Sequence, residues 1–111
     1  MYAFGSIVLT RFPFTDLAGP KVRPALVISR DNDKRADIVL AFIASNTDAW
    51  RDSMPIAPSR RNGLKVASTV RFDKVAALEL RVIVGKIGEA EPAFLKAAAS
   101  LFHRVFGFDR A

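Results

Sequence analysis

A small set of polar side chains lies at the ends of apolar runs in this 111-residue chain. The set combines one carboxylate, two guanidinium groups and two hydroxyls, and its members are Arg23, Ser45, Thr47, Arg71 and Asp73. Side chains two residues apart on a strand point to the same face, so Arg71 and Asp73 should lie together. Such groups can remove a proton, stabilise a developing negative charge and donate a hydrogen bond.

The scarcity of cysteine and histidine limits the classes of reaction that the chain can be expected to catalyse. The chain has no cysteine and one histidine, His103, which is expected on the polar face of a helix. We therefore expect no metal site, no cofactor and no serine–histidine hydrolase chemistry. RNA supplies its own nucleophile, the 2′-hydroxyl, so a carboxylate base and cations that stabilise the phosphate are sufficient to cut it.

Each candidate also has a purely structural interpretation. Arg23 can pair with Asp16 across a loop, and Arg71 with Asp73 can form a surface ion pair. Both hydroxyl residues can tie down a loop through backbone hydrogen bonds. Residue types and spacing thus lead to a basic small β-barrel with nucleic acid as its expected ligand, and they do not establish a nuclease.

The charge distribution supports a polyanionic ligand. Lysine and arginine number 17 against 11 acids, which gives a net charge of +6. One short segment concentrates the cations Arg60, Arg61, Lys65, Arg71 and Lys74. Basic surfaces attract nucleic acid, although a cationic surface also occurs simply as a solvated one.

The sequence predicts several short strands followed by one helix, and these elements must position the candidate residues. Apolar or alternating runs predict strands at 5–12, 24–29, 38–45, 54–57, 66–72 and 75–80, with a last strand at 81–88. Helical spacing of apolar residues begins at Pro92 and continues to Phe106, with Glu89 and Glu91 near the positive end of the helix dipole. These patterns predict a mainly β single domain over residues 1–111, a small β-barrel with a C-terminal α-helix.

No secretory signal pattern and no apolar run of membrane-spanning length are found in the sequence. We therefore expect a cytoplasmic protein without a membrane partner.

Four blocks of sequence closely resemble the MazF/PemK (Kid) family of toxin ribonucleases. They are "GSIVLTRFPFTDLAGPKVRPALVIS", "VLAFIASNT", "NGLKVASTVRFDKVAAL" and "VGKIGEAEPAFLKAAASLF". The resemblance implies an SH3-like β-barrel that forms a homodimer and cuts single-stranded RNA without a metal. It also implies a cognate antitoxin whose disordered tail lies across the active groove.

The resemblance carries roles to individual positions. The arginine of the family's Arg-Pro motif falls on Arg23, which would grip the scissile phosphate. The arginine and aspartate of the Kid branch fall on Arg71 and Asp73, which would act as charge stabiliser and base. The family's threonine falls on Ala44, so the hydroxyl is expected from Ser45 or Thr47. The predicted RNA path comprises Lys21, Arg60, Arg61 and Ser68.

Two other functions share this fold class. One is an RNA-binding barrel with weak or lost catalysis, and the other is a toxin of the same fold that acts on DNA gyrase. The Arg-Pro block and the Arg71/Asp73 pair favour RNA cleavage over both.

Overall fold

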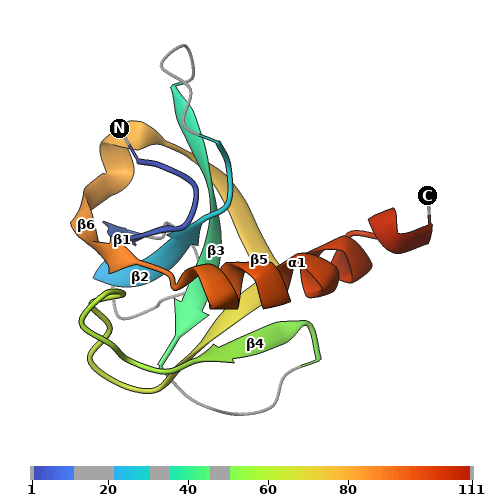
Figure 1. The fold of residues 1–111 in the computed structure, drawn as a ribbon. Coiled ribbons are helices and arrows are strands. Elements are labelled where there is room, and N and C mark those ends of the chain that lie inside the picture. Colours follow the sequence, from blue (N-terminus) through green and yellow to red (C-terminus); the bar gives the residue numbers. More distant parts are fainter. Residues whose placement is uncertain (1, 12–21, 31–35, 46–50, 111) are drawn as a thin grey trace.

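The computed structural model describes residues 2–11, 22–30, 36–45 and 51–110. One antiparallel sheet contains the six strands β1 (Ser6–Arg11), β2 (Val22–Val27), β3 (Asp37–Ala44), β4 (Ser53–Ile56), β5 (Ser68–Glu79) and β6 (Ile83–Glu89). Their order across the sheet is β4-β5-β3-β2-β1-β6 (Figure 1). The helix α1 (Pro92–Val105) follows β6, and 3₁₀ turns occur at Leu80–Val82 and Phe108–Arg110.

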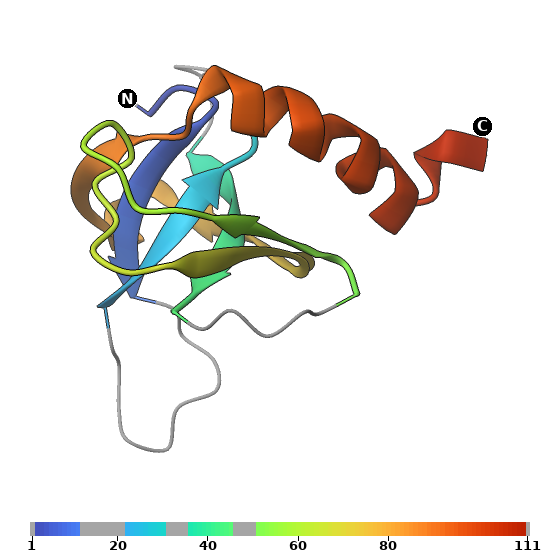
Figure 2. The same cartoon turned by 60° about the horizontal axis from the view of Figure 1, so that its bottom comes forward.

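The mainly β fold with a C-terminal helix is confirmed, but the sheet curls without closing into a complete barrel. β4 and β6 are its two edges and do not pair with each other in the strand order (Figure 2). The loop between β4 and β5 bridges to β6 instead, because the Glu89 amide donates a 2.8 Å hydrogen bond to the Arg61 carbonyl. "Barrel" therefore describes the curvature of the sheet and not its hydrogen bonding.

A bulge in the long strand β5 produces part of this curvature. Ala41 of β3 pairs with Val75, whereas the next residue, Phe42, pairs with Arg71. A move of one residue along β3, from Ala41 to Phe42, thus corresponds to a move of four residues along β5. Residues 72–74 have no partner of their own on β3. Such extra residues bend a strand and increase its twist. The separate strands expected at 66–72 and 75–80 are consequently one continuous strand.

Strand alternation divides the apolar residues between two cores. Ile7, Leu26 and Ile43 belong to the core that α1 covers, while their neighbours Val8 and Ala25 belong to a second core on the other face. The helix contributes buried Ala98 and Leu101 to the first core. Helix and sheet are thereby fixed relative to each other by apolar burial.

β2 begins at Val22, so Arg23 lies inside the strand and not before it, which corrects the expected start at Pro24. Pro24 pairs with Leu9 of β1, and pairing with β3 begins only at Ala25. Proline has no N–H to donate, and none is needed at position 24 for pairing with β3, because that pairing begins one residue later.

Glu91 is the residue preceding α1, as expected, but its side chain makes no capping hydrogen bond to the helix. Its carboxylate accepts hydrogen bonds from the Ser59 hydroxyl and from the Asn62 side-chain amide. Glu89 instead faces Lys86 and Arg61. Glu91 therefore links the start of α1 to the β4–β5 loop, and Glu89 links the end of β6 to the same loop, in addition to any effect on the helix dipole.

Candidate nucleic-acid interface

Arg23, Phe42 and Arg71 lie on one face of the sheet and come from three neighbouring strands. Phe42 of β3 pairs with Arg71 of β5 and, on its other side, with Ala25 of β2. Paired residues project to the same face, and Arg23 shares it because it lies two residues before Ala25. The Arg23 guanidinium carbon lies 6.0 Å from the centroid of the Phe42 ring, within the range of a cation–π contact.

Arg71 and Asp73 form a bidentate pair on this face, as their spacing predicts. Arg71 Nε donates to Asp73 Oδ1 at 3.0 Å and Nη2 donates to Oδ2 at 2.5 Å. Their side chains are 16% and 32% exposed, so solvent still reaches the pair. The hydrogen bonds from Arg71 hold the pKa of Asp73 below its ordinary value, and burial opposes this only in part. The carboxylate is therefore ionised at neutral pH.

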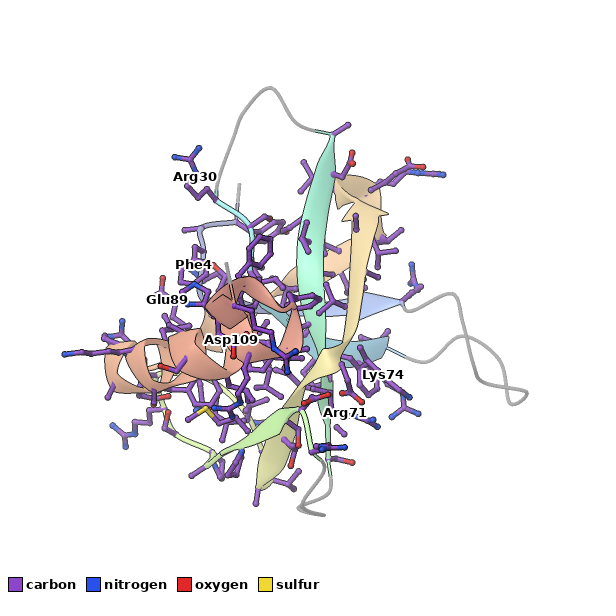
Figure 3. All side chains as sticks on the ribbon, turned by 90° about the vertical axis from the view of Figure 1, so that its right-hand side faces the viewer. Phe4, Arg30, Arg71, Lys74, Glu89 and Asp109 are labelled. Carbon is purple, nitrogen blue, oxygen red and sulfur yellow. The ribbon has the colours of Figure 1, made fainter. Side chains whose placement is uncertain are left out.

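Lys74 joins the same face because of the β5 bulge. In a regular strand a residue three positions from Arg71 would point to the opposite face. Its ammonium nitrogen nevertheless lies 5.9 Å from the Phe42 ring centroid. Figure 3 shows Lys74 on the side of β5 that faces away from α1. We refer to Arg23, Phe42, Arg71, Asp73 and Lys74 as the cation cluster.

The predicted hydroxyl donors are placed differently from one another. β3 ends at Ala44, so Ser45 lies in an exposed bend just beyond the strand. Thr47 lies outside the described residues, as does Lys21. Ser68 is 3% exposed, and its hydroxyl donates to the Val66 carbonyl at 2.9 Å. The structure therefore does not bring Ser68 into the cation cluster.

Arg60 and Arg61 lie in the β4–β5 loop, at a different place on the sheet. Arg61 contacts Glu89, which pairs with Ser6 at the first residue of β1. Arg23 pairs with Thr10, near the other end of the same strand. The four-residue separation along β1 corresponds to about 13 Å. Any RNA path that joins these cations to the cation cluster must therefore run along the sheet.

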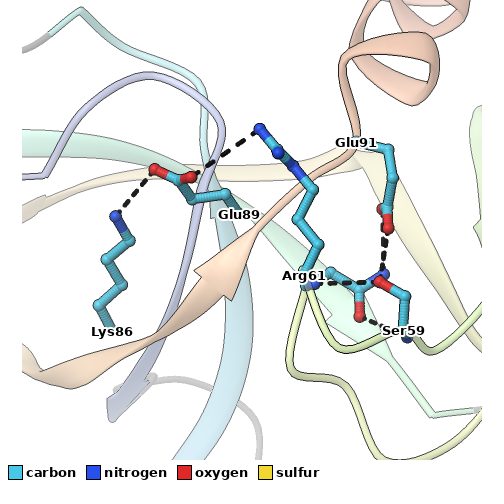
Figure 4. A network of polar contacts seen from close by, with 6 residues as sticks. Ser59, Arg61, Lys86, Glu89 and Glu91 are labelled. Atoms are coloured by element: carbon cyan, nitrogen blue, oxygen red, sulfur yellow. Dashed lines mark hydrogen bonds and ion pairs between the residues drawn. The ribbon is translucent and has the colours of Figure 1, made fainter.

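A polar network around the buried Asn62 side chain fixes the loop that carries these arginines (Figure 4). Asn62 is fully buried, and its side-chain amide donates to Glu91 and to the Ala57 carbonyl. The Ser59 hydroxyl donates to the second carboxylate oxygen of Glu91, and this bond lowers the pKa of Glu91. The start of α1 and the β4–β5 loop are thereby joined through side chains.

Sequence reasoning missed Phe42, Lys74 and Ser53 as neighbours of the candidate residues. Ser53 of β4 pairs with Arg71 on the side away from Phe42, which places its hydroxyl on the same face. An aromatic residue within an aliphatic strand was the available signal for Phe42. Lys74 was seen only as part of the basic segment, since the bulge that turns it has no evident sequence signature.

Two further observations come from the described part of the chain. No group of three or more histidine, cysteine, aspartate or glutamate side chains lies close enough there to hold a metal ion. None of its helices has the length and apolar character needed to cross a membrane.

Comparison with known proteins identifies a family. The model of the family described as "PemK-like, MazF-like toxin of type II toxin-antitoxin system" matches residues 3–106. A comparison of the sequence with curated proteins finds no match.

Solved structures share the fold at low sequence identity. An endoribonuclease in complex with its cognate antitoxin from a mycobacterial species has a TM-score of 0.77 and 19% identity, with 96% of each chain covered. The Mycobacterium tuberculosis toxin MazF-mt6 has a TM-score of 0.77 and 19% identity, covering 92% of this chain and 96% of its own. MazF from Deinococcus radiodurans has a TM-score of 0.76 and 21% identity, with 96% of each chain covered.

Proposed function

The chain belongs to the PemK-like, MazF-like toxins of type II toxin–antitoxin systems, and on this premise we propose that it is an endoribonuclease that cuts single-stranded RNA without a metal. One observation carries the proposal: Arg23 and the Arg71–Asp73 pair come from separate strands and gather around Phe42 on one face. Two cations beside an accessible carboxylate match the needs of a phosphate that gains negative charge near a proton acceptor.

In the proposed reaction, Asp73 accepts the proton of the RNA 2′-hydroxyl, and the freed oxygen attacks the adjacent phosphorus. The bond from phosphorus to the 5′-oxygen breaks, and that oxygen takes a proton from solvent. Arg23 and Arg71 stabilise the charge that accumulates on the phosphate oxygens. Ser45 or Thr47 donates a hydrogen bond to the same group. The products are a 2′,3′-cyclic phosphate and a 5′-hydroxyl.

Before RNA binds, the hydrogen bonds from Arg71 keep the proposed base, Asp73, weakly basic. While Arg71 holds the carboxylate, the lowered pKa keeps Asp73 ionised but makes it a weak base. A bound phosphate competes for the guanidinium, because arginine binds phosphate and carboxylate with the same fork of donors. Loss of these hydrogen bonds raises the basicity of Asp73 at the moment that RNA is present.

The decisive experiment is digestion of a mixed RNA pool by the purified protein in EDTA, followed by sequencing and chemical analysis of the new ends. We expect cuts in single-stranded segments with cyclic phosphate and 5′-hydroxyl termini. Complete loss of cutting in EDTA that a divalent ion restores would show that the metal-free mechanism is wrong. Binding without cutting under both conditions would favour an RNA-binding module.

The proposal includes a cognate antitoxin and a homodimer, and it requires the toxin to act in the cytoplasm, where its RNA substrate is found.

The homodimer is favoured by exposed aromatic side chains, since Phe4, Phe106 and Phe108 are all exposed. The last turns of α1 project beyond the sheet in Figure 2. Three further aromatic residues of the sequence, Phe12, Phe14 and Trp50, lie outside the described residues. Sedimentation at micromolar concentration should show a dimer, and a monomer would contradict this part of the proposal.

A further inference from the structure

We propose that Lys74 is a positioning residue that binds a backbone phosphate of the RNA strand beside the phosphate held by Arg23 and Arg71. This inference rests on the proposed ribonuclease function and adds a residue to its substrate-binding surface. Neither the basic segment in the sequence nor the Arg71/Asp73 spacing assigns Lys74 this role, because a regular strand would turn it to the opposite face.

The geometry places Lys74 next to the candidate reaction centre. The Arg23 guanidinium carbon and the Lys74 ammonium nitrogen both lie about 6 Å from the centroid of the Phe42 ring. Their separation therefore cannot exceed about 12 Å, which keeps both cations within reach of one short stretch of a bound strand. The ring also attracts the ammonium group and limits its freedom, since a cation over an aromatic face is held electrostatically.

The charge of Lys74 remains available for a ligand. Its sequence neighbour Asp73 gives both carboxylate oxygens to Arg71. No carboxylate among the described residues forms an ion pair with Lys74, and the side chain is exposed. An exposed ammonium group on a flexible stem acts on phosphate as a point charge, which suits a contact that holds the strand without directing the chemistry.

The role predicts a specific kinetic and thermodynamic signature. A residue that binds the ground state and the transition state equally changes KM and leaves kcat unaltered. Each phosphate contact to a single strand contributes about 0.7 to the slope of log K against log salt concentration. Lys74→Gln should therefore raise KM by roughly three- to tenfold at low salt and reduce the salt slope by about 0.7.

The test uses the full chain and one single-stranded oligonucleotide that the wild-type protein cuts. Binding is measured on the same oligonucleotide with a 2′-deoxynucleotide at the cut position, because this substrate lacks the nucleophile. Lys96→Gln, an exposed lysine on α1, makes the same change of charge away from the cation cluster and is the matched control. Lys74→Arg keeps the charge and should restore the wild-type slope and KM to within about twofold.

The outcomes separate this inference from the function on which it rests. A KM and salt slope equal to those of Lys96→Gln would overturn it, as would a fall in kcat with KM unchanged. If the wild-type protein binds RNA but does not cut it, the proposed function fails and the salt slope alone decides the role of Lys74. If the wild-type protein does neither, both proposals fall.

Discussion

Exchange of the buried Asn62 for aspartate tests the polar network that joins the β4–β5 loop to α1. The side-chain oxygen of Asn62 accepts hydrogen bonds from the amides of Ser59 and Leu64, each at 3.0 Å. Its nitrogen donates to the Ala57 carbonyl at 2.8 Å and to Glu91 Oε1 at 3.1 Å. Aspartate has the same shape and keeps both acceptor contacts, so Asn62→Asp removes only the two donated bonds.

The expected cost follows from what replaces those bonds. An oxygen would face the Ala57 carbonyl and the Glu91 carboxylate in a site where Asn62 is fully buried. A buried charge without a partner typically costs about 3–5 kcal/mol, and the two retained amide donors offset part of this. We expect a loss of about 3 kcal/mol in the free energy of unfolding at pH 7. For a domain of this size, that corresponds to a fall in Tm of about 10–15 °C.

The pH dependence has a definite sign. Burial and the nearby negative charge of Glu91 raise the pKa of the new carboxyl group in the folded state above its unfolded value. A raised folded pKa makes the variant gain stability relative to wild type as the pH falls and lose it as the pH rises. Urea unfolding at pH 7 and pH 5 should therefore show the larger deficit at pH 7.

A double variant supplies the control. Glu91→Gln places an amide donor opposite the new carboxylate, so it should cost less stability in the Asn62→Asp background than in wild type. A free energy of unfolding within about 0.5 kcal/mol of wild type at pH 7 would refute the reasoning, since surface substitutions away from such networks have effects of this size. So would a deficit that grows on acidification.

Three further predictions concern the site and its frame. Asp73→Asn should lower the rate of RNA cleavage by ~10²-fold or more at unchanged fold, and a wild-type rate would exclude Asp73 as the base. Gly63→Ala should cost several times more unfolding free energy in urea than Gly107→Ala, because both have positive φ but only at Gly63 would a Cβ lie 2.1 Å from a backbone carbonyl of β6. Equal losses would contradict this account of the loop. The double variant Arg60→Glu, Arg61→Glu should weaken titrations of both RNA and antitoxin, and unchanged antitoxin binding would place the inhibitor elsewhere.

The sequence alone was sufficient for the C-terminal helix and for one pair in the candidate site. Apolar spacing predicted α1 from Pro92, and the observed helix ends one residue before the expected Phe106. The i, i+2 spacing placed Arg71 and Asp73 on one face, where they pair. The helix prediction depends only on a backbone period that neighbouring residues determine without distant contacts. Arg71 and Asp73 share a face as the two-residue period predicts, although Asp73 lies within the β5 bulge.

Pairing between strands decided the remainder of the site. The Arg-Pro motif made Arg23 a candidate, but only the registers of β2, β3 and β5 bring it to the Phe42 ring beside Arg71. Lys74 reaches that ring because the β5 bulge interrupts the two-residue period from which its direction would be predicted. A bulge reflects how two strands with different curvature fit against each other, so the sequence of one strand does not specify it.

The β4–β5 loop shows the same division between sequence and tertiary structure. The strands predicted at 54–57 and 66–72 require a connection between them, and residues 57–67 do form the connection between two strands. The burial of Asn62, its bond to Glu91 and the contact of Arg61 with Glu89 join segments about 30 residues apart. Local propensity determines that the chain turns here, whereas the curl of the sheet determines which distant carboxylates meet the loop and where its arginines lie.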